Sequence, residues 1–214
     1  MNRVGTRSVS EVLVKVANPC FVQAPVASNA YFASLSQVLA RLESGIVDQI
    51  VETIWQGYES RRIIYLFGNG GSAALASHLA CDLNKGTIVN GQRRMRAVSL
   101  TDSVPLLTAW ANDSHYDEIF AEALRNFVQE GDLVLAISAS GNSPNVIRGL
   151  EVAREAGATV MALTGFKGGR AKELCDLCLV VPSDNMEQIE DVHLSVAHAI
   201  STAIRQRMIK CDEE

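Results

Sequence analysis

Gly68-Asn69-Gly70-Gly71-Ser72 lies between two segments of different character. The residues before it, 62–67, form a short apolar run with β-branched and aromatic side chains, which predicts a buried strand. Residues 73–83 after it are rich in Ala and Leu, which predicts a helix. Glycines at a strand-to-helix turn let the backbone approach a ligand, and the first N–H groups of the helix can hold an anion. The stretch therefore predicts an α/β fold with an anion-binding turn.

A second turn of the same kind follows downstream. Ser138-Ala139-Ser140-Gly141-Asn142-Ser143 separates an apolar strand at 133–137 from a helix at 144–155. Its three hydroxyls and its backbone N–H groups predict a phosphate cradle that needs no arginine. The alternative is a polar turn with Ser143 as N-cap and Pro144 at the first helical position. Three serines exceed what a cap needs, so we favour a phosphorylated small-molecule ligand.

The rest of the chain alternates between strands and helices. This order is typical of a doubly wound parallel sheet that helices cover on both faces. Ligands of such sheets bind beyond the carboxyl ends of the strands, where both turns are expected. The further strands are predicted at 97–100, 159–164 and 177–181, and the further helices at 104–111, 117–127 and 186–208.

The N-terminal part is predicted to lie outside this core. Residues 1–27 form an irregular arm, with a short helix over 9–16, and residues 28–214 form one domain. Apolar residues at helical spacing predict two amphipathic helices, 29–42 and 45–59. These helices either pack against a partner subunit or form a lid on one face of the sheet, and the sequence leaves both alternatives open.

Composition restricts the classes of function. The net charge is −5 with no long basic block, which argues against nucleic acid as the main ligand, although a local basic patch would escape this test. No apolar run approaches the ~20 residues of a membrane span, and no signal peptide is recognised, so we expect a cytoplasmic protein without membrane association. The five cysteines are scattered, as in reduced proteins. Cys175 and Cys178 could be a zinc half-site or a redox pair, but two structural thiols are favoured.

Nucleotide cofactors are disfavoured by the details of the first turn. Residues 68–73 fit the dinucleotide fingerprint G-x-G-x-x-G/A, which is a weak signal alone. The acidic residue expected ~20 positions on is displaced to Asp102, and the serine turn has no role in a dinucleotide site. No Lys-Ser/Thr follows the glycines, so the turn is not a P-loop. We expect no nucleotide cofactor.

A set of titratable side chains accompanies the two turns. His78 and Asp82 are four residues apart on the helix after the first turn, so they share one face. Glu190, His193 and His198 lie on the last helix. Two imidazoles and two carboxylates can form an acid–base set or an N2O2 zinc site.

Together these motifs resemble the sugar isomerase (SIS) domain family, and within it the phosphoheptose isomerases. The resemblance covers about residues 28–210. It rests on the following stretches: GNGGS at 68–72, His78, Ala111-Asn112-Asp113, AISASGNSPNVI at 136–147, ALTG at 162–165 and QIEDVHLSVAH at 188–198. The resemblance implies an SIS-type doubly wound sheet.

The resemblance also implies the site residues. Substrate-binding positions correspond to Asn69, Gly70, Gly71, Ser72, Asn112, Asp113, Ser138, Ala139, Ser140 and Ser143. Catalytic positions correspond to Asp82, Glu190 and His198, and members that bind zinc would use His78, Asp82, Glu190 and His198. The sequence departs from the family pattern twice, with Asp82 for a Glu and Glu190 for a Gln.

The implied reaction converts a 2-ketose 7-phosphate, sedoheptulose 7-phosphate, to an aldose 7-phosphate through an enediol. The implied assembly is a homo-oligomer, a tetramer, with Zn²⁺ as the candidate metal. The rival interpretation is a non-catalytic SIS protein that senses a phosphosugar or serves as a protein-binding scaffold, like a relative that associates with the replication initiator. The acid–base set favours the enzyme, and its two substitutions favour the rival.

Overall fold

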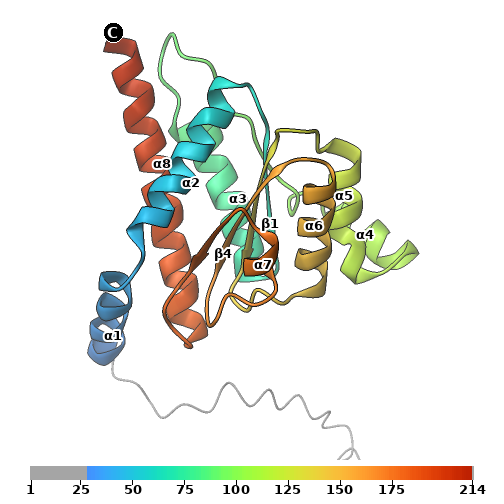
Figure 1. The fold of residues 1–214 in the computed structure, drawn as a ribbon, viewed down its shortest axis with the longest axis horizontal. Coiled ribbons are helices and arrows are strands. Elements are labelled where there is room, and N and C mark those ends of the chain that lie inside the picture. Colours follow the sequence, from blue (N-terminus) through green and yellow to red (C-terminus); the bar gives the residue numbers. More distant parts are fainter. Residues whose placement is uncertain (1–27, 214) are drawn as a thin grey trace, which may run out of the picture.

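A computed structural model of the chain describes residues 28–213. The predicted arm at 1–27, with its short helix at 9–16, lies outside the described residues. The described residues contain a five-stranded parallel sheet with helices on both faces (Figure 1). Within this part of the chain, no helix is both long enough and apolar enough to cross a membrane.

The elements follow the predicted alternation closely. The strands are β1 (Ile64–Gly68), β2 (Ala97–Ser99), β3 (Leu133–Ser138), β4 (Thr159–Thr164) and β5 (Leu177–Val180). The α-helices are α1 (Ser28–Ala40), α2 (Ser44–Glu59), α3 (Gly71–Cys81), α4 (Val104–Asp113), α5 (Ile119–Phe127), α6 (Pro144–Glu155), α7 (Ala171–Leu174) and α8 (Met186–Glu213).

Two apolar layers enclose the sheet. Along β1, alternate side chains enter opposite layers, because successive residues of a strand point to opposite faces. Ile64 and Leu66 pack with α2, α3 and α8, while Tyr65 and Phe67 pack with α5 and α6. All five residues of β1 are buried, as expected for a central strand of a parallel sheet. Figure 1 shows these two groups of helices on either side of the strands.

The strand order is β2-β1-β3-β4-β5, with every neighbouring pair parallel. The chain thus leaves β1 in one direction to form β2 and returns past β1 to form β3. Ligands of open α/β sheets bind at such a switch point, outside the carboxyl ends of the two strands. The turn at 68–72 follows β1 and the turn at 138–143 follows β3, so both lie at this point. The doubly wound α/β fold is confirmed.

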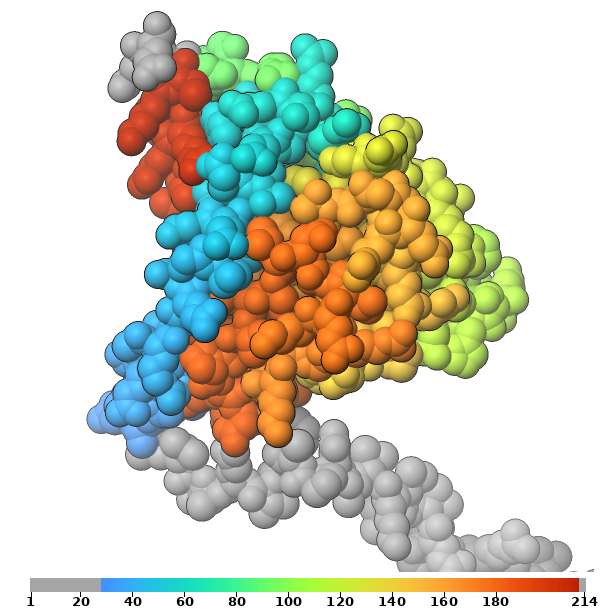
Figure 2. Space-filling view, viewed as in Figure 1, coloured from blue at the N-terminus to red at the C-terminus, as the bar shows by residue number. Residues whose placement is uncertain are grey.

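Two features differ from the predicted elements, and a third decides between the two alternatives for the N-terminal helices. The short helix α7 was not predicted, since four residues carry no recognisable period. Helix α3 continues into a π-helical turn at Asp82–Gly86, where an α-helical end was expected. Ile50 and Ile54 of α2 are fully buried against the sheet side of the core, so α2 is a lid on one face. Helix α1 buries only Val38, and Figure 2 shows it at one corner of the molecule.

Candidate active site

The two ligand turns are joined by a pair of side-chain amides. Asn69 donates from Nδ2 to Oδ1 of Asn145 at 2.8 Å, and Asn145 donates back to Oδ1 of Asn69 at 2.8 Å. The Tyr116 hydroxyl donates a further hydrogen bond to Asn69 Oδ1 at 3.2 Å. Asn145 is 1% exposed, so breaking this pair would leave buried polar groups without partners. The amide pair fixes the first turn against the start of α6.

A pocket of about 180 Å³ opens between the two turns. Its polar lining comes from hydroxyls and amides of both turns, and Glu190 of α8 closes one side. The lining residues are Asn69, Ser72, Ile137, Ser138, Ala139, Ser140, Ser143, Met186 and Glu190. No arginine or lysine is among these lining residues. We refer to this pocket as the serine pocket.

The hydroxyl of Ser143 is not used as a helix cap. Ser143 occupies the N-cap position of α6 and Pro144 the first turn, as the capping alternative expected, but the side chain makes no capping hydrogen bond. The loop is held in another way, because Asn142 accepts from the backbone N–H of Arg170 at 2.9 Å and donates to the Ser140 carbonyl at 3.0 Å. The Ser143 hydroxyl is therefore free to bind a ligand in the serine pocket.

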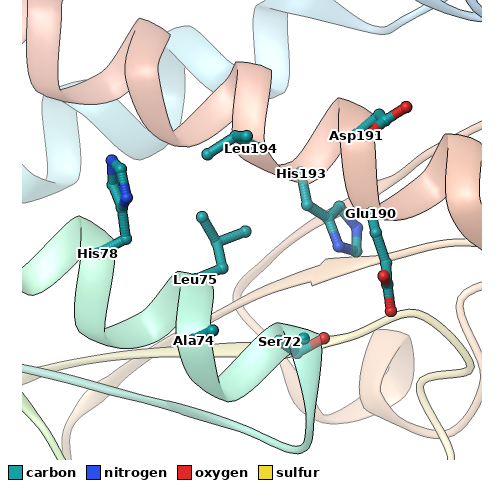
Figure 3. A pocket seen from close by; sticks show the side chains of 9 residues that line it. Ser72, Ala74, Leu75, His78, Glu190, Asp191, His193 and Leu194 are labelled. Carbon is teal, nitrogen blue, oxygen red and sulfur yellow. The ribbon is translucent and has the colours of Figure 1, made fainter.

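A groove between α3 and α8 continues from the serine pocket. It has a volume of about 290 Å³ and is lined by residues of both helices, from Ser72 to His78 and from Glu190 to Leu194 (Figure 3). The Glu190 side chain points from α8 toward the start of α3 (Figure 3). A Cβ atom at Gly71 would lie only 3.2 Å from Glu190 Oε2. Glu190 and Ser72 line both hollows, so the carboxylate lies where the groove meets the serine pocket.

Three of the predicted metal ligands converge farther along the same helices. His78 Nε2 lies 3.1 Å from His198 Nε2 and 3.5 Å from Asp82 Oδ2. The three ligand atoms lie within 4.8 Å of one another. Two imidazole nitrogens at this distance need a proton or a cation between them, because two facing lone pairs repel. Two nitrogens bound at ~2.1 Å to one tetrahedral zinc ion would be roughly 3.4 Å apart, so the donor set fits a divalent metal.

The structure separates the two carboxylates that the sequence grouped together. Asp82 belongs to the histidine cluster and begins the π-helical turn; its carboxylate also accepts from the Ser201 hydroxyl at 3.4 Å. Glu190 is not a member of that cluster but lines the serine pocket. Asp82 lines neither the serine pocket nor the groove. Single π-helical turns are frequent at functional sites, which agrees with the place of Asp82.

His193 is a buried neutral histidine beside the groove. It is 0% exposed, and its Nε2 lies 3.0 Å from the carbonyl oxygen of Thr164. A carbonyl only accepts, so Nε2 carries the proton and Nδ1 carries the lone pair. Nδ1 is buried and has no partner among the described residues. Burial lowers the pKa of His193 to about 4, despite the hydrogen bond to Thr164, which acts in the opposite direction.

Other residues singled out in the sequence lie away from these hollows. Asn112 and Asp113 are exposed at the end of α4, where Asn112 donates to Asp113 at 2.7 Å, and neither lines the serine pocket. Asp102, considered for a dinucleotide site, accepts a hydrogen bond from Ser77. Burial raises the pKa of the Cys175 thiol to about 12, which agrees with a structural thiol at that position.

Sequence reasoning missed two residues of the site. Asn145 and Tyr116 both form hydrogen bonds with Asn69. Asn145 lies in the first turn of α6, and Tyr116 lies in a short 3₁₀ turn. Only Asn145 had a recognisable signal, because it lies two residues after Ser143, the last residue of the serine turn. Tyr116 reaches Asn69 across 47 positions of sequence, a pairing that no local pattern encodes.

The sequence of the chain is similar to that of known proteins of one family. Residues 30–165 match the model of the SIS domain family. The phosphoheptose isomerase of Pelobacter propionicus is 37% identical over 179 residues, which cover 84% of this chain and 92% of that protein. The phosphoheptose isomerase of Aliarcobacter butzleri is 42% identical over 154 residues, covering 72% and 79%.

Solved structures give the same result for the fold. The structure of phosphoheptose isomerase from Neisseria gonorrhoeae matches with a TM-score of 0.78 at 31% identity, covering 84% of this chain and 97% of that chain. A phosphoheptose isomerase from Francisella tularensis matches with a TM-score of 0.79 at 29% identity, covering 84% and 96%. The chain therefore belongs to the SIS domain family, and within it to the phosphoheptose isomerases.

Proposed function

We infer that the protein is a phosphosugar aldose–ketose isomerase that converts sedoheptulose 7-phosphate to D-glycero-D-manno-heptose 7-phosphate. The observation that carries this inference is the position of Glu190. Its carboxylate lines the serine pocket together with the hydroxyls of Ser138, Ser140 and Ser143. One hollow thus presents a phosphate cradle and, beside it, a carboxylate that can move a proton.

The serine turn supplies the binding side of this function. Ser138, Ser140 and Ser143 offer hydroxyl donors. At the start of α6 the backbone N–H of Asn145 is free for an anion, whereas Pro144 has no N–H and Val146 donates to Asn145 Oδ1. Phosphate binding through such donors needs no cationic side chain. Asn69, Gly70, Gly71 and Ser72 would hold the sugar hydroxyls from the other turn. Asn112 and Asp113 stay predicted contacts, which a movement of α4 or a second subunit would have to bring to the substrate.

The chemical step needs one base and one proton relay. We assign the base to Glu190, which removes a proton from C1 of the ketose and returns it to C2 of the enediol. A second group moves one proton between the oxygens O2 and O1, so that no atom is gained or lost. His198 and His78 are the candidates for this relay, because their Nε2 atoms are 3.1 Å apart and His78 lines the groove that leads from Glu190. Asp82, 3.5 Å from His78, would orient that imidazole.

The histidine cluster is also the candidate zinc site, and this role is an alternative to the proton relay, because an imidazole nitrogen bound to the ion cannot also take up a proton. His78, Asp82 and His198 would hold the ion as two nitrogens and one oxygen. A bound divalent cation would polarise the substrate carbonyl. Glu190 would be a fourth ligand only if α8 or its own side chain moved, so we place it with the substrate. A cytoplasmic location and a homotetramer also stay predictions.

The test is direct turnover of sedoheptulose 7-phosphate. Purified protein is incubated with the ketose in deuterated water, with and without Zn²⁺, and the products are followed by NMR. We expect an aldose 7-phosphate to form and deuterium to enter at C2, because the transferred proton exchanges with solvent on the base. Saturable binding of the ketose without product or exchange under either condition would overturn the isomerase and favour the sensor.

A further inference from the structure

Five arginines line one pocket at the edge of the sheet that faces away from the serine turn. The pocket has a volume of about 430 Å³, and its lining consists of Tyr58, Arg61, Arg62, Arg93, Arg94 and Arg96. Arg61 and Arg62 precede β1, and the other three precede β2. They therefore lie at the amino ends of these parallel strands, about 15 Å from the carboxyl ends at ~3.3 Å per residue. We refer to this hollow as the arginine pocket.

Within the part of the chain whose side chains the structure describes, no neighbouring carboxylate neutralises the charge of the arginine pocket. Among residues 28–211, no carboxylate oxygen lies within 4.0 Å of a nitrogen of these five guanidinium groups. Two acidic residues near these strands have other hydrogen-bond partners. Glu59 accepts from the indole of Trp55 at 3.0 Å, and Asp132 accepts from the backbone N–H groups of Ile63 and Gln129. Five positive charges thus share one hollow in a chain of net charge −5.

The guanidinium groups are held in place by the surrounding backbone. Arg62 donates to the carbonyl of Glu130 at 2.9 Å, and Arg96 donates to the carbonyl of Arg61 at 3.0 Å. Arg93 stacks over the buried ring of Tyr58, with 5.2 Å between its Cζ atom and the ring centroid. Arg61 has a φ of 59°, a left-handed conformation that costs free energy for a residue with a side chain. These contacts hold the charges together before any ligand binds.

We propose that the arginine pocket binds a small polyphosphate anion, such as the triphosphate group of a nucleotide. Arginine is suited to phosphate because its planar fork donates two parallel hydrogen bonds. Several phosphates are needed, since a single phosphate dianion would leave most of the five charges without a partner. A volume of about 430 Å³ falls within the range of small-molecule pockets. The overall negative charge of the chain disfavours a long polyanion such as nucleic acid, which would meet repulsion beyond the pocket.

The test is calorimetric titration of the whole protein with inorganic triphosphate at low ionic strength. We expect saturable binding with one site per chain. The Arg94 side chain makes no hydrogen bond or ion pair with the described residues, so Arg94→Gln removes charge without removing a structural contact. This variant should raise the Kd roughly ten-fold or more, the effect of losing one charged partner. Arg205→Gln, which removes the same charge from the exposed surface of α8, should leave the Kd unchanged.

Three further measurements separate binding in the arginine pocket from binding in the serine pocket and from general attraction of anions. Ser143→Ala should not change triphosphate binding, because Ser143 belongs to the serine pocket; a loss of binding there would show that triphosphate occupies the sugar site and would overturn the proposal. Orthophosphate should bind much more weakly than triphosphate. Equal affinity for the two anions, or tighter binding of a single-stranded oligonucleotide in competition, would also overturn it. None of these outcomes depends on isomerase turnover.

Discussion

Glu190 is the residue on which the proposed chemistry depends most. In the described structure it is the carboxylate that lines both the serine pocket and the groove. Glu190→Gln keeps the size of the side chain and removes the base. We expect kcat for sedoheptulose 7-phosphate to fall by ~10²–10⁴, the usual contribution of a general acid–base group, with little change in substrate binding. Steady-state kinetics and calorimetry of the same variant would measure both quantities.

Asp82→Asn is the matched comparison for this experiment. Asp82 is distant from the serine pocket and belongs to the histidine cluster. Its substitution should act through metal affinity, so added Zn²⁺ should restore part of the lost turnover. Added Zn²⁺ should not rescue Glu190→Gln. If Glu190→Gln kept normal turnover while Asp82→Asn lost it irrecoverably, the assignment of the base to Glu190 would be wrong.

The serine hydroxyls should contribute to the free energy of binding the phosphate group of the sugar. Both side chains, Ser138 and Ser143, line the serine pocket, and neither hydroxyl makes a hydrogen bond to another described residue, so both are available to a phosphate there. Ser138→Ala and Ser143→Ala should each weaken phosphosugar binding by roughly 1–3 kcal/mol, the range for loss of a partner to a charged group. Titration with substrate at equilibrium measures this. Unchanged affinity in both variants would contradict the cradle.

His193 predicts how the stability of the protein depends on pH. Burial lowers its folded-state pKa to about 4, while an unfolded histidine has a pKa of about 6.5. Above pH 6.5 the ring is neutral in both states. Between pH 6.5 and about 4 the unfolded chain binds a proton that the folded chain does not. The free energy of unfolding should therefore fall as the pH falls through this window, by about 3 kcal/mol in total.

Urea denaturation at several pH values tests this prediction, with His193→Gln as the comparison. The glutamine amide can still donate to the Thr164 carbonyl but does not titrate in this range. The variant should lose less stability between pH 7 and pH 4.5 than the parent protein, by an amount close to the His193 contribution. Equal losses in both proteins would assign the acid sensitivity to other groups.

At the level of elements, the turn between β1 and α3 has glycines with different roles. A Cβ at Gly71 would meet the Glu190 carboxylate at 3.2 Å, whereas a Cβ at Gly68 would lie 2.6 Å from the backbone oxygen of Ile137. Gly71→Ala should therefore displace Glu190 and lower turnover roughly ten-fold or more, with a change in stability below ~1 kcal/mol. Gly68→Ala should instead destabilise the fold by about 1–3 kcal/mol, since backbone atoms must shift.

Measuring turnover and thermal unfolding of both variants side by side tests whether Gly71→Ala affects activity and Gly68→Ala affects stability. The Gly71 variant should unfold near the temperature of the parent protein while its kcat is reduced. The Gly68 variant should unfold at a lower temperature. A Gly71 variant with full activity would mean that the position of the Glu190 carboxylate is not critical for proton transfer.

Elements were predictable where the local pattern and the global packing agree. The strand at 159–164 and the helix start at 144 are found where apolar periodicity and Pro144 placed them. The conformation of 82–86 was not predictable, because an α-helix and a π-helical turn share the same composition and spacing of apolar residues. Helix α7 is too short for any periodicity to be read.

The site was predictable only in part, because a local pattern places neighbouring residues of one turn but not residues spaced along a helix. The turn residues are contiguous in sequence, so Asn69 and Ser138 could be assigned to one pocket from the parallel sheet alone. Distances along a helix are harder to use, because Glu190 and His198 are about two turns apart and each faces a different part of α3. The sequence grouped them as one metal set, whereas the structure divides them into a substrate carboxylate and a member of the histidine cluster.

At the level of the whole molecule, the site is open in a single chain. Glu190, His78 and His198 are accessible to solvent, as are Asn112 and Asp113. Enediol chemistry benefits from exclusion of water, since a low-dielectric site strengthens the interactions with developing charge. The openness of the site, together with the exposed apolar residues of α1, is therefore consistent with the predicted homo-oligomer, in which a second chain would cover the groove.

The oligomer prediction can be tested through α1. This helix buries only Val38 but exposes Phe32 by 64% and Leu39 by 40%, and it lies beside α8, whose residues form the groove. Light scattering should give four times the 23.1 kDa mass of one chain. Phe32→Glu should reduce both the mass and the turnover, because a charge in an apolar contact between subunits opposes assembly. Phe127→Glu, a matched substitution at the exposed end of α5, should change neither. A monomeric mass for the fully active parent protein would refute both the tetramer and a site completed by a neighbouring chain.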